Sequence, residues 1–338
     1  VPDHQVEVNF ATAITGNEEK DTEYLYGGVI KTDEAGNNKY VFTKDSNINI
    51  KSETGTPGID VKKDVVIDAT GSTLNFDVAG DMGIKQESNK QLSIKADRLN
   101  IKVNNDARAE GLHVASANTN ATTKAEINGN VNINVSGIGY ALGIYAAGNS
   151  VLDINGNVTM KGEGENKWGV TSNGVNSTGY YSTSGIYAGT NPLINKGSTI
   201  NIKGDVDLAI DGSGIVANGA DSTVNVDGGG NIVVNDASKD VHYALIATSG
   251  TINMNVNKGK TGAANHDVNI KGNIGVTDGA AHDNEPAKKS EINLGLNTNQ
   301  SQLHGVIVHD FKQDNLDKGF TGKVNLYMGN YAVWVNEA

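Results

Sequence analysis

The sequence predicts an all-β protein, specifically a right-handed parallel β-helix built of three-strand coils. A short apolar phrase that begins with a small residue returns at intervals of roughly 30 residues, as in a solenoid. Between its copies, segments of alternating apolar and polar residues end at Gly or Asn-Gly. No segment sustains the period of roughly 3.6 residues that marks an amphipathic helix, so we expect helix to be scarce.

Composition favours many short strands over one large compact core. The 338 residues include 42 Gly and only 4 Pro, and 37% of the chain is hydrophobic, which is little for a single globular core of this length. Val, Ile, Thr and Tyr, which favour strands, recur throughout. We therefore predict a long, thin core enclosed by strands and tight turns.

The first repeated phrase marks one strand in each coil. Its copies are GIDV, GIKQ, GLHVA, GIYAAG, GIYAG, GIVANG, ALIAT and GVIVH, beginning at Gly58, Gly83, Gly111, Gly143, Gly185, Gly214, Ala244 and Gly305. The last interval is about twice the others, as expected where one copy of a solenoid repeat has diverged. NIGVTDG, which contains Gly275, lies near its middle and is interpreted as the missing copy.

Two further phrases run in step with the first and supply the remaining strands. In AEINGNVNINVSG, the apolar residues Val131, Ile133 and Val135 alternate with polar ones, so one face is buried and the other is in water. Equal phrases at equal places favour stacked coils over an antiparallel sandwich. Stacked strands lie about 4.8 Å apart, and we expect about 9–11 coils. Stacked Asn side chains at the corners are expected to form hydrogen-bonded ladders.

The repeat divides the chain into two parts. Residues 1–45 break the pattern and are interpreted as an N-terminal cap with a first irregular coil, and residues 46–338 are assigned to the β-helix. The C-terminal segment still has the pattern of strands, so we expect the natural protein to continue beyond Ala338. Loop excursions are predicted where the repeat is interrupted, near residues 162–185, 258–267 and 279–290.

Charge and cysteine content exclude several classes of partner and site. The formal net charge of −12 disfavours nucleic acid and anionic membrane surfaces as partners. The absence of Cys excludes a disulfide framework and a thiolate metal site. No apolar run approaches the ~20 residues that span a bilayer.

The sequence carries no signature of catalysis or of a bound cofactor, so we predict no catalytic residue, no metal ligand and no cofactor. The seven His residues form no HExxH pattern. The best carboxylate cluster, a weak one, is Asp205, Asp207 and Asp211. On a strand, Asp205 and Asp207 would share one face about 7 Å apart at Cα. That spacing suits an acid–base pair, a calcium site or simply a solvated acidic strand.

Aromatic residues concentrate in the longest predicted excursion. Trp168, Tyr180 and Tyr181 lie there among Gly, Ser and Asn. Rigid aromatic side chains beside small polar ones suit the recognition of a protein or a glycan. These three residues are therefore the candidate partner-binding residues, and the alternative is that they pack on the coil.

The phrase GIYAAGNSVLDINGNVTMKG, with its variants, resembles the passenger domains of bacterial autotransporters over roughly residues 46–338. The resemblance implies a secreted β-helix at the cell surface, attached to the outer membrane only through a C-terminal translocator barrel that is absent from this sequence. Passengers of this family are mostly adhesins, aggregation factors, proteases or esterases. The GDSGS-type nucleophile loop of the serine protease passengers is absent, as is the Arg-Gly-Asp tripeptide of some adhesins.

We therefore expect a non-enzymatic adhesin of the bacterial cell surface. It would mediate cell–cell aggregation, biofilm formation or attachment to a host or bacterial surface protein or glycan. A long outward face of Asn, Asp and Thr also suits homotypic association through many weak hydrogen bonds. Two alternatives stay open: a polysaccharide lyase or hydrolase on the same fold, and a passive stalk that carries a distal domain. A groove that holds acids together with Lys or Arg would favour the enzyme.

Overall fold

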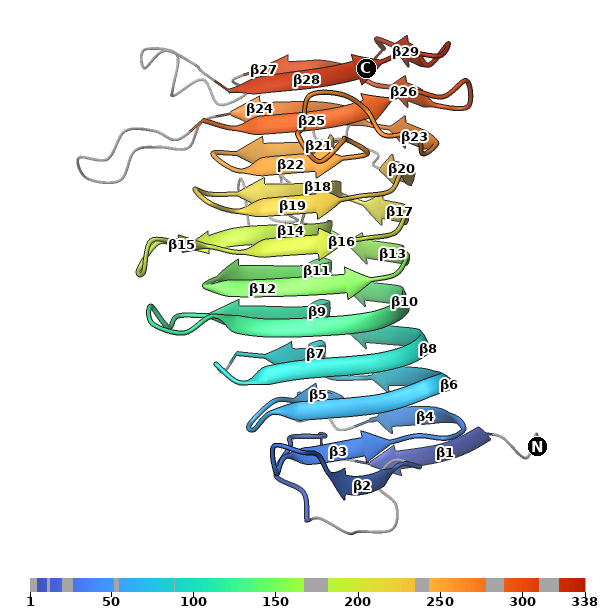
Figure 1. Ribbon diagram of the computed structural model, residues 1–338, viewed down its shortest axis with the longest axis vertical. Helices are drawn as coiled ribbons and strands as arrows, with labels where there is room; N and C mark the ends of the chain where they lie inside the picture. The colour runs from blue at the N-terminus through green and yellow to red at the C-terminus, as the bar shows by residue number, and fades with distance from the viewer. Residues whose placement is uncertain are drawn as a thin grey trace.

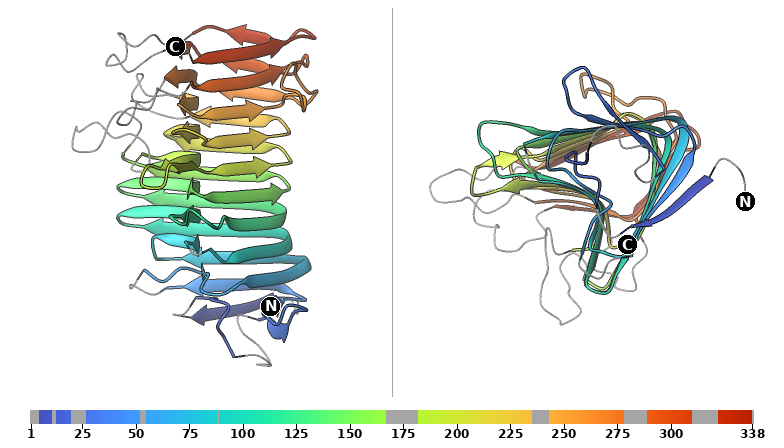
Figure 2. Two further views of the ribbon diagram at one scale, coloured as in Figure 1. Left: turned by 60° about the vertical axis from the view of Figure 1, so that its left-hand side comes forward. Right: turned by 90° about the horizontal axis from the view of Figure 1, so that it is seen from below.

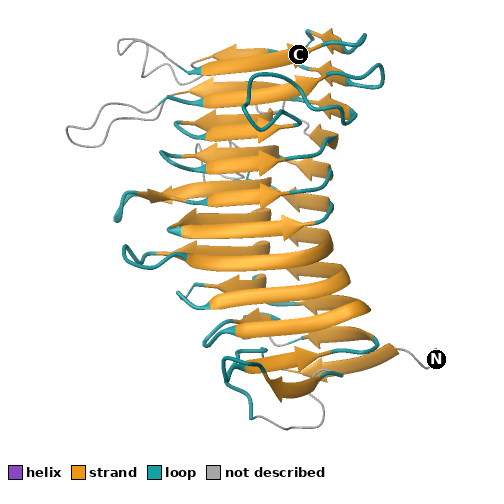
Figure 3. Ribbon diagram, in the orientation of Figure 1, coloured by secondary structure: helices purple, strands orange, loops and turns teal. Residues whose placement is uncertain are grey.

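The computed structural model describes residues 5–10, 13–19, 27–51, 55–87, 89–166, 182–234, 243–277, 289–309 and 322–337. These residues form strands and loops only, which confirms for them the prediction of scarce helix. Accordingly, the described chain offers no helix long and apolar enough to cross a membrane. The strands belong to a 19-stranded and a 10-stranded sheet (Figures 1 and 3).

Equivalent strands of successive repeats pair in parallel, and we group them in three ladders. Ladder 1 contains β1 (Gln5–Phe10), β4 (Asp45–Ile50), the second halves of β6 (Val65–Val78), β8 (Gln91–Asn105) and β10 (Thr123–Gly137), then β13 (Val158–Gly164), β17 (Val206–Asp211), β20 (Gly230–Val234), β23 (Val268–Lys271), β26 (Gln302–His304) and β29 (Val333–Val335). Ladder 2 contains β3 (Asn38–Val41), the first halves of β6, β8 and β10, then β12 (Ser150–Asn155), β16 (Thr199–Ile202), β19 (Thr223–Val226), β22 (Thr251–Met254), β25 (Glu291–Leu296) and β28 (Lys323–Met328).

Ladder 3 forms the second sheet. It contains β5 (Ile59–Asp60), β7 (Met82–Gln86), β9 (Arg108–Ser116), β11 (Tyr140–Gly148), β14 (Ser184–Asn191), β18 (Ser213–Asn218), β21 (Tyr243–Thr248), β24 (Asn273–Thr277) and β27 (Ile307–His309). Two short strands form antiparallel hairpins at the margins: β2 (Val29–Thr32) with β3, and β15 (Lys196–Gly197) with β14. Figure 2 shows the ladders stacked along one axis and, seen from the end, surrounding the core. An all-β arrangement of two parallel sheets is consistent with a solenoid.

The core lies between the ladders and is built by alternation along each strand. Val131, Ile133 and Val135 of β10 are buried, whereas the residues between them face outward, as the sequence predicts. Most buried apolar side chains form one cluster that extends from Ile14 to Leu303, and a second, smaller cluster on β11, β14, β18 and β21 includes Tyr187 and Val216. Each coil therefore adds a layer of Ile, Val and Leu to a core that its neighbours continue.

The repeated phrase places glycine where the core leaves no room for a side chain. Gly83, Gly111 and Gly143 stand at equivalent positions of β7, β9 and β11. A Cβ added at Gly111 would lie 2.7 Å from Cγ2 of Ile133, because the ladder 1 side chain reaches across the core to this point. The small residue that opens each phrase is thus a packing requirement.

The corner between ladders 2 and 1 within β10 needs positive φ. In β10 the register shifts between Asn128 and Asn130, and Gly129 between them has a φ of +141°. A Cβ there would collide with the carbonyl oxygen of Ala96 in the preceding coil. Gly129 therefore allows one continuous strand to turn from one ladder to the next.

The predicted cap joins the same sheet at its N-terminal end. β1 pairs in parallel with β4, and β3 pairs in parallel with β6, so residues on both sides of position 45 share one sheet. The β2–β3 hairpin lies at this end of the molecule (Figure 1). Tyr40 is buried there, where its hydroxyl donates a hydrogen bond to the Glu18 carboxylate and accepts one from the Gly16 amide.

Candidate functional site

Asparagine side chains form a continuous amide ladder on the outward side of ladder 2. The Nδ2 of Asn225 donates to the Oδ1 of Asn201 over 2.9 Å, and the Nδ2 of Asn253 donates to the Oδ1 of Asn225 over 2.8 Å. The same bond is repeated by Asn293 and Asn325, and Asn201 donates to the carboxylate of Asp153. All these amides point the same way along the axis.

Amide stacking occurs on the strands and also at corners, as predicted: Asn155 donates to Asn128 over 2.6 Å at the Asn-Gly corner, and Asn330 donates to Asn297 over 3.2 Å in the turns after β28 and β25. At the corner before β17, side chains instead accept hydrogen bonds from the backbone of the next coil. Asn130 accepts from the amide of Asn157, and Asn157 accepts from that of Asp205. These acceptors are needed because corner backbone turns away from the ladder and leaves N–H groups without a strand partner.

Replacing Asn225 by Ala is expected to lower the free energy of unfolding by about 1–2 kcal/mol, because it removes two amide bonds at about 1 kcal/mol each. Urea denaturation measures the change. Asn134→Ala is the matched control, since Asn134 is an exposed strand Asn for which no side-chain hydrogen bond is found within the described chain. Equal effects of the two substitutions would contradict a stabilising amide ladder.

The excursion at residues 258–267 folds back over ladder 2 instead of projecting from it. Val256 and Ala263 form an antiparallel bridge, and the Tyr327 hydroxyl donates to the carbonyl of Lys260 over 2.8 Å. In Figure 1 this loop crosses β22 and β25. Asn293 is only 1% exposed, so this part of the amide ladder is withdrawn from solvent.

Ladder 1 presents charged and amide side chains to solvent. We call the exposed outward residues of β8, β10, β13 and β17, with the turn before β17, the polar face. Its exposed basic side chains are Arg98, Lys102 and Lys161 on the strands and Lys203 in the turn, and Glu163 on β13 adds an exposed carboxylate. Lys102 and Lys161 stand in one register column, with Asn134 between them. Within the described residues, no ion pair is formed by Arg98, Lys102, Lys161 or Asp207.

The carboxylate cluster predicted from the sequence lies at the C-terminal side of the polar face. Asp205 is in the turn before β17, its Oδ1 accepts a hydrogen bond from the Gly229 amide over 2.8 Å, and its side chain is 56% exposed. Asp207 is exposed on β17, and Asp211 is half-buried at the end of that strand. The described residues include no group of three or more His, Asp or Glu side chains placed to hold a metal ion.

The predicted partner-binding residues Trp168, Tyr180 and Tyr181 lie outside the described residues, as do positions 279–288 of the third excursion. The recognition role assigned to the three aromatic residues therefore stays a prediction.

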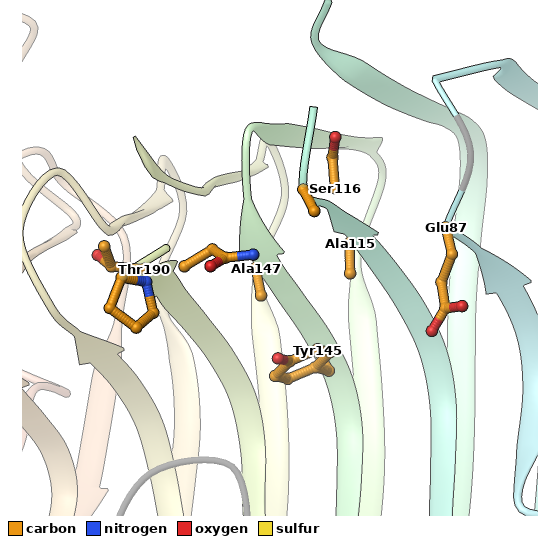
Figure 4. A pocket seen from close by; sticks show the side chains of 9 residues that line it. Glu87, Ala115, Ser116, Tyr145, Ala147 and Thr190 are labelled. Atoms are coloured by element: carbon orange, nitrogen blue, oxygen red, sulfur yellow. The ribbon is translucent and has the colours of Figure 1, made fainter. Parts of the chain in front are cut away.

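Ladder 3 carries a groove of about 360 Å3 on its outward side. Its floor has small side chains, because Ala115 and Ala147 are paired on β9 and β11, and the β14–β15 hairpin borders it on one side (Figure 4). Glu87 stands on the opposite side, with Tyr145 between (Figure 4). The lining residues are Glu87, Ala115, Ser116, Ala117, Tyr145, Ala147, Thr190, Asn191 and Pro192.

A buried histidine holds the groove carboxylate in place. Nε2 of His113 lies 2.9 Å from Oε1 of Glu87, and its Nδ1 lies 3.0 Å from Oε1 of Glu110. His113 is 4% exposed and Glu110 is fully buried. Lys85 completes the cluster, with its Nζ 3.6 Å from Oε2 of Glu87.

The two carboxylates keep His113 protonated. Burial alone lowers the pKa of His113, but the hydrogen bonds and charges of Glu110 and Glu87 outweigh it and raise the pKa to about 9. The hydrogen bond from His113 lowers the pKa of Glu87 to about 2, against a smaller opposing effect of burial. At neutral pH, therefore, an imidazolium lies between Glu87 and Glu110.

Aromatic rings continue this cluster along the axis. The rings of His113 and Tyr145 have centroids 4.9 Å apart, and those of Tyr145 and Tyr187 are 5.5 Å apart and stacked. Asn218 donates a hydrogen bond to the Tyr187 hydroxyl over 2.8 Å. Burial raises the pKa of Tyr187 to about 12 and that of Tyr145 still further, so both hydroxyls stay neutral.

Sequence reasoning assigned no role to His113, Glu87 or Glu110. A signal was present in the repeated phrase, because Lys85, His113, Tyr145 and Tyr187 occupy its third position in four successive copies. These residues pair from strand to strand in ladder 3 and point outward. Comparing the third residue of each copy would have grouped these four side chains in one outward column.

Comparison with protein-family models, with curated proteins and with solved structures finds no match.

Proposed function

We propose that this chain is the passenger region of a bacterial autotransporter adhesin, exposed on the cell surface and folded as a right-handed parallel β-helix of three-strand coils. Copies on neighbouring cells associate with each other through the polar face and so aggregate the cells. Parallel pairing of equivalent strands in three ladders supports the fold. The association is supported by one observation in particular: Arg98 and Lys102 of β8 lie at one end of the polar face, and Asp205 and Asp207 lie at the other end, before and on β17.

The polar face is complementary to itself. Its basic group, Arg98, Lys102 and Lys161, lies on β8 and β13, and Asp205 and Asp207 lie one strand further along the axis. A second copy related by a two-fold axis that lies in the plane of the interface, parallel to the strands and between β10 and β13, brings each basic group opposite the partner's acidic group. Such an interface is isologous and closed, so it joins two molecules without building a filament.

The same arrangement makes the association antiparallel, as an encounter between two facing cells requires. The exposed Asn and Thr side chains between the charged groups, such as Asn132 and Thr159, supply further weak hydrogen bonds. Because the charges are solvent-exposed, the attraction is screened over about 8 Å at physiological ionic strength. Association is therefore weakened by salt.

The Lys102→Glu/Lys161→Glu double variant is expected to weaken self-association at least about 10-fold, because it sets like charges opposite each other across the interface. Asp207→Lys is expected to weaken it in the same direction. Sedimentation at several protein and salt concentrations measures the dimer, and clumping of inert bacteria that display the protein measures adhesion. A mixture of the two variants is expected to recover association, because their altered charges are complementary.

Asn120→Lys is the control, because Asn120 is exposed in a loop that does not belong to the polar face. It changes the net charge and is expected to leave both readouts unchanged. A protein that stays monomeric at every concentration and clumps no cells would refute the proposed association. Clumping that survives both charge reversals would refute the polar face as its site.

A further inference from the structure

We infer that the groove on ladder 3 is a binding site for a neutral saccharide. The inference depends on the groove alone and holds whether or not copies associate through the polar face. The groove crosses the outward side of β9, β11 and β14, on a different sheet from the polar face. Its volume of about 360 Å3 is within the usual range for small-ligand sites.

The middle of the groove is apolar and is formed by the fold itself. Ala115 pairs with Ala147, and Ala147 pairs with Gly189, so three neighbouring strands carry no large side chain at this outward position. Tyr145 adds its ring edge, because His113 and Tyr187 occupy the two sides of that ring. The C–H surface of a pyranose ring is complementary to such a floor.

Polar groups stand on the two opposite sides of this floor. Both Glu87 oxygens are held, one by His113 and one by Lys85, yet the side chain is 49% exposed and its remaining lone pairs accept hydroxyl groups. On the other side, Asn191 uses its Oδ1 to accept a hydrogen bond from the Leu193 amide. Its Nδ2 donates to nothing in the described chain and is available to a ligand. A fixed acceptor facing a fixed donor across an apolar floor matches a ring with hydroxyls at both edges.

Charge selects a neutral ligand. The negative charges of Glu87 and Glu110 are balanced by the positive charges of Lys85 and His113, so the cluster adds no net charge. A uronic, sialic or sulfated sugar would meet the Glu87 carboxylate, and no Lys or Arg is among the described lining residues to compensate for it. A cationic ligand would compete with His113 and Lys85 for the same oxygens.

The geometry indicates binding without cleavage. Glycoside hydrolysis ordinarily needs two carboxyl groups on either side of the scissile bond. Among the described lining residues Glu87 is the single carboxylate, and Glu110 is fully buried behind His113. The described surface of the groove therefore presents one acid, whose neighbour Lys85 does not line it, and lacks the second carboxylate that the enzymatic alternative needs.

The test is a glycan array that carries neutral and anionic glycans, followed by titration of the best neutral glycan and its sialylated counterpart. We expect binding to at least one neutral glycan, with the sialylated form at least about 10-fold weaker. Ala115→Phe fills the space above the floor from a half-buried position and is expected to weaken the affinity for the glycan at least about 10-fold. Glu87→Gln and Asn191→Ala are expected to weaken it by a smaller factor.

Two controls separate this proposal from the proposed association. The Lys102→Glu/Lys161→Glu variant is expected to keep glycan binding while it loses self-association, and Ala115→Phe is expected to do the reverse. Circular dichroism verifies that each variant is folded. The inference is overturned by an array with no neutral ligand, by equal affinity for neutral and sialylated glycans, or by full binding in Ala115→Phe. Release of new reducing ends from the bound glycan would show cleavage, and the inference of binding alone would then give way to the hydrolase alternative.

Discussion

Replacing Ile144 by Ala is expected to lower the free energy of unfolding by about 3–4 kcal/mol. Ile144 is fully buried in β11, where it pairs with Leu112 on one side and Ile186 on the other. Truncation leaves a cavity that cannot close, because the coils above and below fix the strand spacing at about 4.8 Å. Urea denaturation followed by circular dichroism measures the loss.

Ile138→Ala is the matched control, since Ile138 precedes β11 and is 56% exposed. It removes the same atoms from a solvated position and is expected to change the free energy by less than about 0.5 kcal/mol. Equal losses for the two variants would mean that the ladder 3 side chains do not share the core of ladders 1 and 2.

The order of the strands could be predicted because each repeated phrase carries its own register. Ile84, Leu112 and Ile144 follow the small first residue of three copies and pair with one another as expected. The missing copy is also present, but at a different register from the one its glycine suggested. Ile274, not Gly275, pairs with Leu245, and Gly275 pairs with Ile246 in the outward column.

The groove and its charged cluster could not be predicted, because no single stretch of sequence contains them. Glu87 and His113 are 26 residues apart and meet only when β7 and β9 pair. Glu110 breaks the rule that a charged residue on a strand faces water: it is fully buried, and an isolated buried carboxylate is costly. Its burial becomes intelligible once His113, three residues further along β9, is seen to neutralise it.

The stability of the folded protein is expected to fall by about 3 kcal/mol as the pH rises from 6.5 to beyond 9, through the loss of the His113 proton. The pKa of His113 rises on folding, so its stabilising contribution is complete below pH 6.5 and is lost as the pH passes about 9. The pKa of Glu87 falls on folding from 4.5 to about 2, so its contribution is complete above pH 4.5 and is lost as the pH approaches 2. Maximal stability from this cluster lies between about pH 4.5 and 6.5.

His113→Gln is expected to abolish the alkaline part of this profile, because Gln donates a hydrogen bond to a carboxylate but has no proton to lose. The variant is less stable at every pH, since Glu110 stays buried without a cation, and the slope between pH 6.5 and 9 is the informative quantity. His266→Gln is the control, because the His266 side chain is 55% exposed, with its Nδ1 3.9 Å from Asp205, and is expected to leave the profile unchanged. Urea denaturation at a series of pH values measures all three proteins, and an unchanged alkaline slope in His113→Gln would assign the titration to another group.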